Sequence, residues 1–295
     1  MLLILSLALC VVLFSACSPS TDDASMEQKS RVSVDFSTFQ VEVEDMSRSS
    51  RTAPALSDVA DRLSFAVFKE DGVTLVEETT IHQEKTSNGI GFGSVEVELY
   101  PGNYKMVVVA HSGSDNADIE SATSVILPGS TYTDTFTKVA DFTVVSNKHS
   151  NLSKTLDRIT SAFILKLNDT PPANASRIEV ILNNGGSVPN PLSINPKAGL
   201  ATENWSQTRS FTIEEITDET PDHIYYISKS LPFALTVKAT AYDSGNEEII
   251  RHIIPDVPLT PNKKTVASGT FFQSSASGFF TITSDWDSDD QEIEY

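Results

Sequence analysis

The chain has 295 residues and carries 40 Asp and Glu against 21 Lys and Arg, a formal net charge of −19. This excess of negative charge repels phosphate backbones and argues against nucleic acid as a partner. The hydrophobic fraction of 39% is large enough for buried cores, and two cysteines are too few for a disulfide-stapled fold.

The first sixteen residues have the pattern of a secretory signal peptide. Residues 2–16 are uncharged and apolar, a run shorter than the roughly 20 residues of a membrane-spanning helix. Residues 14–17 (FSAC) have the pattern of a lipobox, in which small residues precede a cysteine whose thiol takes a diacylglycerol. We expect residues 1–16 to be removed and Cys17 to begin the mature chain with acyl chains attached. The alternative is an ordinary signal peptide with an incidental cysteine.

The chain that follows is expected to begin as an acidic tether over residues 17–30. Beyond it, apolar and polar residues alternate over most of the sequence, which favours half-buried strands. The alternation is clearest over residues 63–67, 94–100, 104–110, 163–167, 178–182 and 235–242. Only residues 55–62 favour a short helix. Many short strands with regular turn sequences predict an all-β protein of antiparallel sandwiches.

Turn sequences separate the strands. Pro101-Gly102-Asn103 predicts a tight hairpin between its two flanking strands, and Ser244-Gly245-Asn246 closes the strand that ends near residue 242. Residues 106–113 weakly resemble residues 237–245, which indicates two tandem sandwiches of related build. We place their boundary in the polar stretch 146–153. The predicted domains are residues 31–147 and residues 155–295, the second with an acidic tail.

The loop between the first two predicted strands contains a candidate processing site. Residues 45–52 are polar and lie between a strand predicted over 31–43 and a strand predicted over 63–68. They include Arg48 and Arg51, and exposed loops of this kind are where proteases cut. An uncut linker is the alternative.

The sequence contains no constellation typical of an enzyme. The five histidines lack metal-ligand spacing and are expected at the surface or at strand edges. No Gly-x-Ser-x-Gly, P-loop or Gly-x-Gly-x-x-Gly motif occurs. Residues 285–290 (DWDSDD) resemble the start of an EF-hand loop, but Asp290 stands where that loop needs glycine. We expect no enzyme and no cofactor apart from the lipid on Cys17; cation binding by the acidic run stays open.

The order and spacing of several segments resemble the FimB/Mfa2 family of Bacteroidetes fimbrillins, anchor or accessory subunits of type V pili. The segments are Cys17, the strand 31–43 and residues 56–68, 99–113 and 158–163. The resemblance implies two transthyretin-like antiparallel β-sandwich domains and binding to other fimbrial subunits. It also implies a lipoprotein of the outer membrane, exposed at the cell surface. Residues 18–23 resemble the acidic export signal of surface lipoproteins in this phylum. A host or bacterial surface ligand stays open.

The same resemblance implies assembly by strand complementation. In polymerising subunits an Arg- or Lys-specific protease removes the first strand, and a strand of a neighbouring subunit fills the groove that opens, a form of β-augmentation. Anchor subunits keep the first strand and the lipid. In this sequence the groove-filling residues would be Val32, Val34, Phe36, Val41 and Val43. The expected subunit contact is the closing region, at Phe279, Phe280 and Ile282.

We therefore expect a fimbrial anchor or accessory subunit. One alternative is a stalk or tip fimbrillin, released by cleavage near Arg48 or Arg51. The other is a surface glycan-binding lipoprotein, for which Trp205 and Trp286 are the only tryptophans available as an aromatic platform.

Overall fold

The computed structural model describes the greater part of the chain, namely residues 28–36, 55–86, 91–128, 133–183, 192–201, 206–217, 224–227, 235–273 and 281–283. The expected all-β fold is confirmed: within these residues the secondary structure is strand apart from two short helices, α1 (Leu56–Val59) and α2 (Ile213–Thr217). No helix in the described part of the chain is long and apolar enough to cross a membrane. The predicted signal peptide and acidic tail lie outside the described residues.

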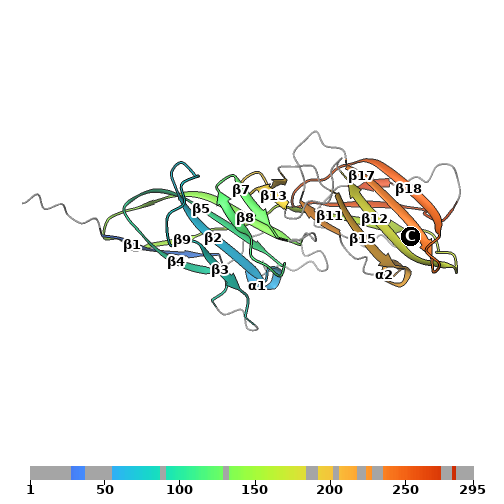
Figure 1. The fold of residues 1–295 in the computed structure, drawn as a ribbon, viewed down its shortest axis with the longest axis horizontal. Coiled ribbons are helices and arrows are strands. Elements are labelled where there is room, and N and C mark those ends of the chain that lie inside the picture. The colour runs from blue at the N-terminus through green and yellow to red at the C-terminus, as the bar shows by residue number, and fades with distance from the viewer. Residues whose placement is uncertain are drawn as a thin grey trace, which may run out of the picture.

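The first half of the molecule is built on a five-stranded sheet in the order β10-β8-β5-β2-β3 (Figure 1). Its strands are β2 (Arg62–Lys69), β3 (Ile81–Glu84), β5 (Gly102–His111), β8 (Thr135–Val144) and β10 (Asp157–Arg158). A three-stranded sheet packs on one face and consists of β4 (Ser94–Leu99), β1 (Ser30–Asp35) and β9 (Ser150–Ser153) in that order. Phe65, Met106, Val108 and Phe136 are fully buried in the core between these sheets.

The opposite face of the five-stranded sheet is also covered. A further sheet in the order β14-β13-β7-β6 consists of β6 (Asp118–Ser121), β7 (Ser124–Leu127), β13 (Leu192–Asn195) and β14 (Leu200–Ala201). Phe68 and Val107 on this face belong to one apolar cluster with Ile119, Val125 and Ile194. Strands β2 and β5 are therefore buried on both faces, whereas sequence alternation indicated only one apolar face.

The second half contains two four-stranded sheets (Figure 1). One has the order β16-β11-β19-β20, from β11 (Thr160–Leu167), β16 (Ile224–Ile227), β19 (Lys264–Gly269) and β20 (Thr281–Thr283). The other has the order β15-β12-β17-β18, from β12 (Ala175–Asn183), β15 (Ser206–Thr212), β17 (Leu235–Asp243) and β18 (Glu248–Val257). Phe163, Val180 and Val237 are buried in its core. The two similar sequence segments lie in β5 and β17, which are both interior strands of their sheets.

Two sequence expectations about connections differ from the structure. The turn at Pro101–Asn103 joins β4 to β5, but these strands belong to different sheets, so it is a crossing between layers and not a hairpin. The reason is that both strands direct their apolar residues into the same core and therefore face each other. The first half also extends past residue 147, because β9 pairs with β1 and β10 pairs with β8.

His111 is a further correction, because it is buried and not at the surface. Its Nδ1 accepts a hydrogen bond from the backbone N–H of Gly113 at 3.0 Å, and its Nε2 has no partner in the described part of the chain. Burial, with a smaller contribution from the positive charge of Arg62, lowers the pKa of His111 from 6.5 to about 4. The ring is therefore neutral in the folded protein at neutral pH.

Replacing Phe68 tests whether the second face of the central sheet is truly closed. Phe68 is fully buried, so Phe68→Ala is expected to lower the free energy of unfolding by about 3–5 kcal/mol. Val73→Ala is the control, because Val73 is 69% exposed and its truncation should change stability by less than about 0.5 kcal/mol. Urea denaturation measures both; similar small effects for the two variants would contradict the covered face.

The buried histidine predicts a loss of stability on acidification. Its folded pKa is about 4 and its ordinary value is 6.5, so the unfolded chain takes up a proton that the folded chain excludes between these values. The free energy of unfolding should fall as the pH drops from about 6.5 to about 4, and His111→Gln should remove about 3 kcal/mol of that fall. Urea denaturation at a series of pH values checks this, and parallel pH profiles for the two proteins would refute it.

Candidate functional site at the first strand

Strand β1 is the first described strand in the sequence, yet it occupies the middle of its sheet. It pairs antiparallel with β4, with Ser30 opposite Leu99 and Asp35 opposite Ser94. On its other side it pairs parallel with β9, with Val32 opposite Ser150. Within the described residues, β4 and β9 are joined only through β1.

The apolar side chains of β1 and the residue after it are directed into the core. Val32 and Phe36 are fully buried and Val34 is 1% exposed. The ring of Phe36 lies 6.4 Å from the ring of Phe65, measured between centroids. Burial of three side chains of this size stabilises the sandwich by about 5–9 kcal/mol. The strand is therefore a structural part of this core.

Hydrogen bonds beyond the ladder hold both ends of β1 in register. At its start, Ser30 Oγ donates to the carbonyl of Val145 at 3.1 Å. At its end, the N–H of Phe36 donates to the carbonyl of Gly93 at 2.8 Å, and the N–H of Lys154 donates to the carbonyl of Asp35 at 3.2 Å. A register shift of one residue would break these contacts and turn the valines outward.

The outward face of β1 carries weaker polar contacts. Ser33 Oγ donates to Glu96 Oε2 at 3.2 Å, and Arg31 Nε lies 3.3 Å from Glu96 Oε1. Both partners of that ion pair are about half exposed, so the pair contributes little to stability. The attachment of β1 thus depends on its buried face and on its backbone.

This arrangement is suited to strand exchange. Without β1, the facing edges of β4 and β9 would expose unpaired backbone groups on either side of an apolar floor that includes Phe65. An extended segment with alternate apolar side chains fits such a groove through main-chain hydrogen bonds and side-chain pockets.

Only some of the predicted site residues lie in the part of the chain that the structure describes. Val32, Val34 and Phe36 come together in the groove, but β1 ends at Asp35, and Val41 and Val43 lie outside the described residues. Cys17, Arg48, Arg51, Phe279 and Phe280 also lie outside them. Ile282 is in β20, at the edge of its sheet, opposite Ala267. Sequence reasoning missed β9, whose four residues Ser150–Ser153 are too few and too polar to show a period.

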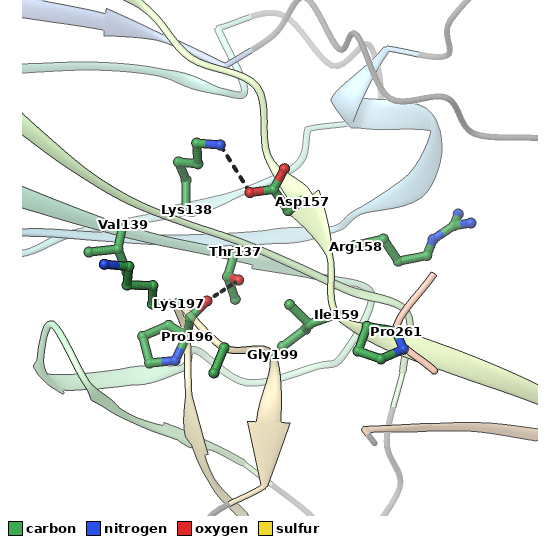
Figure 2. Close-up of a pocket in the computed structure, with 11 residues that line it drawn as sticks. Thr137, Lys138, Val139, Asp157, Arg158, Ile159, Pro196, Lys197, Gly199 and Pro261 are labelled. Atoms are coloured by element: carbon green, nitrogen blue, oxygen red, sulfur yellow. Dashed lines mark hydrogen bonds and ion pairs between the residues drawn. The ribbon is translucent and has the colours of Figure 1, made fainter. Parts of the chain in front are cut away.

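A second candidate is a cavity of about 300 Å³ where the two halves meet (Figure 2). Residues of β8 and β10 line it together with the turn at 196–199 and with Pro261. Lys138 Nζ lies 2.9 Å from Asp157 Oδ2, and Thr137 Oγ1 donates to the carbonyl of Pro196 at 2.6 Å (Figure 2). These four polar groups are therefore paired with one another.

Beside the cavity, a buried ion pair joins the last strand of the first half to the chain before β8. Arg158 NH2 lies 2.9 Å from Asp134 Oδ2, and Thr160 Oγ1 donates to Asp134 Oδ1 at 2.7 Å. Burial raises the pKa of Asp134, although Arg158 and Thr160 oppose that effect. No group of three or more metal-ligating side chains occurs in the described part of the chain. These contacts stabilise the boundary between the two halves. We assign no chemistry to the cavity.

Comparison with known proteins identifies a family and a shared fold. The model of DUF6562, described as a family of unknown function, matches residues 24–295. No curated protein matches the sequence. Among solved structures, a candidate cell adhesion protein from Bacteroides eggerthii is 11% identical with a TM-score of 0.51, over 87% of this chain and 95% of that one.

Two further solved structures are fimbrial proteins. The fimbrial anchor protein Mfa2 from Porphyromonas gingivalis is 11% identical with a TM-score of 0.48, over 86% of this chain and 95% of that one. A fimbrial assembly protein from Parabacteroides distasonis is 12% identical with a TM-score of 0.46, over 87% and 98%. The fold expected from the sequence resemblance is shared with the cell adhesion protein from Bacteroides eggerthii.

A charge placed on the buried face of β1 tests its place in the core. Val34→Asp is expected to destabilise the protein by about 3 kcal/mol or more, because the carboxylate would be buried without a partner. Ser33→Asn, one residue away on the outward face, should change stability by less than about 0.5 kcal/mol. Denaturation midpoints and protease digestion compare the two; equal tolerance of both changes would show that β1 does not fill the groove.

Proposed function

We propose that this chain, which belongs to the DUF6562 family, is a fimbrial subunit of the anchor or accessory type, attached to the outer membrane by lipid on Cys17. The fold that it shares with the solved cell adhesion protein supports the general class. The place of β1 fits the anchor role, and an uncut precursor of a polymerising fimbrillin would hold β1 in the same way, so processing decides between the two roles. A subunit that keeps its first strand has a closed groove, and β1 is bound in the groove of this chain by three buried side chains.

The position of β1 in the sequence adds to this argument. The strand follows Cys17 by only a short stretch of chain, so a lipid on Cys17 and the first sandwich stay connected as long as β1 stays bound. A cut at Arg48 or Arg51 would break the covalent link between β1 and the rest of the sandwich. Retention of the intact chain is therefore what separates an anchor from a polymerising fimbrillin.

Binding to other fimbrial subunits is expected to use strand addition. Strand β20 is an edge strand, and within the described residues its outer side has no strand against it. An edge strand offers free backbone donors and acceptors to an incoming strand. We propose the region of β20, with Ile282, as a subunit contact.

The proposal is tested by the intact mass and the N-terminus of the native protein from outer-membrane fractions. The expected result is a chain that begins at an acylated Cys17. A chain that begins at Ser49 or Thr52 and lacks lipid would overturn the anchor role in favour of a polymerising fimbrillin.

Two variants serve as matched controls for this measurement. Cys17→Ala should lose the acyl mass and leave the membrane fraction while the folded body is retained. Arg48→Ala with Arg51→Ala should leave the mass and location of an anchor unchanged, since an anchor is not cut there. A shift to a longer, lipidated chain in the double variant would reveal processing in the wild type.

A further inference from the structure

The exposed apolar side chains are unevenly distributed over the molecule. Among the described residues, the large apolar side chains with the greatest exposure are Val73, Leu75, Tyr100, Val145 and Ile253, at 69%, 46%, 48%, 48% and 64%. Ile253 lies in β18 of the second half. The other four belong to the first half and come from three separate connections.

Strand register brings these four side chains to one end of the first sandwich. At that end, Lys69 of β2 pairs with Tyr104 of β5, and Gly102 pairs with Val144 of β8. Val73 and Leu75 follow β2 at this level, Tyr100 precedes β5, and Val145 follows β8. We call this end the tether pole and define it as Lys29 with residues 69–75, 99–102 and 144–148.

The chain from Cys17 enters the molecule at the same end. Ser30, the first residue of β1, pairs with Leu99 and donates a hydrogen bond to Val145. Figure 1 shows β1 at the end of the long axis opposite to the second half. Ten residues separate Cys17 from Gln28, so the pole cannot lie more than about 40 Å from the lipid.

The charge of the tether pole also differs from that of the whole chain. The pole carries Lys29, Lys69 and Lys148 against the carboxylates of Glu70 and Asp71, whereas the chain has a net charge of −19. Lys29 Nζ lies 5.6 Å from the centre of the Tyr100 ring. Tyrosine and lysine beside exposed aliphatic residues are typical of surfaces at the boundary of lipid headgroups and acyl chains.

We propose that the tether pole contacts the membrane surface, with its aliphatic side chains and Tyr100 at the headgroup boundary and its lysines near lipid phosphates. This inference rests on the proposed lipid at Cys17. Acyl chains alone suffice for anchorage, so the pole adds orientation: it holds the first sandwich against the membrane and directs the second half away from it.

The test is fluorescence quenching on the full-length lipidated protein in vesicles of phosphatidylethanolamine and phosphatidylglycerol. The vesicles also contain a phosphatidylcholine that carries a nitroxide quencher near its headgroup. Val73→Cys and Ile253→Cys provide single free thiols for a dye, because the thiol of Cys17 would carry the diacylglycerol and Cys10 would be removed with the signal peptide. Both sites are exposed and apolar, so they form a matched pair. The dye at residue 73 should lose most of its fluorescence and the dye at residue 253 almost none.

A charge-matched pair of double variants tests the role of the lysines. Lys29→Glu with Lys148→Glu should reduce the quenching at residue 73, because the pole would then be repelled by the anionic lipid. Lys166→Glu with Lys263→Glu, which changes net charge equally in the second half, should leave it unchanged.

The outcomes separate this inference from the proposed function. A chain whose mass shows the acyl groups but whose dyes at residues 73 and 253 are quenched equally, or not at all, overturns the membrane contact and leaves the anchor intact. Such a result would be expected if the pole bound a partner protein instead of lipid. A chain that lacks acyl groups and stays in the supernatant overturns both.

Discussion

Strands β2 and β5 are apolar on both faces, and the architecture of the first half follows from the need to cover each face. One face is closed by the β4-β1-β9 sheet and the other by the β6–β7 hairpin. The hairpin is widened by β13, which comes from the second half and pairs with β7. The need to cover both apolar faces of β2 and β5 therefore has two consequences. It makes β1 necessary on one face of the central sheet, and on the opposite face it joins the two halves through the pairing of β7 with β13. Phe68 and Ile194, far apart in the sequence, share one core for this reason.

The two covers differ in how they are attached, and this difference bears on function. The β6–β7 hairpin of the second cover lies in the sequence between β5 and β8, whereas β1 is linked to α1 through residues 37–54. All the pairings among β10, β8, β5, β2 and β3 are independent of β1. Strand β1 alone could therefore be exchanged while the hydrogen bonds of the central sheet stay intact. A sandwich with one separable strand is the physical requirement for assembly by strand complementation, and under the proposed function a bound β1 would be the closed state of such a unit.

Alternation in the sequence predicted which residues lie inside, but it could not predict which strands are neighbours. Val95, Val97 and Leu99 face the core as expected, and so do Tyr104 and Met106. A period of two shows which side chains of a strand face the core, but it does not show which strand pairs with it. Alternation therefore predicted a hairpin of β4 and β5, although these strands belong to different layers. The parallel pairing of β9 with β1 and the pairing of β7 with β13 are long-range and leave no local signal. His111 was misjudged because a histidine at a strand end is usually exposed, and its burial depends on the layers that meet around it. Of the candidate site, the buried residues of β1 were predictable and its position between β4 and β9 was not.

The acidic character of the chain has a consequence once one end of the molecule is near a membrane. A chain with a net charge of −19 is repelled by an anionic lipid surface, but salt limits this repulsion to about 8–10 Å. A lipid on Cys17 would keep the first sandwich within reach of that range, because the connecting chain is short. At such distances, an orientation in which an acidic flank faces the membrane is disfavoured. An orientation in which the tether pole faces it is not, because the pole has more lysines than carboxylates and four exposed apolar side chains. The repulsion of the body and the attraction of the pole then act in the same direction. Under the proposed membrane contact, the two effects together would set the long axis of the molecule away from the membrane. The edge strands of the second half would then lie where other subunits can reach them.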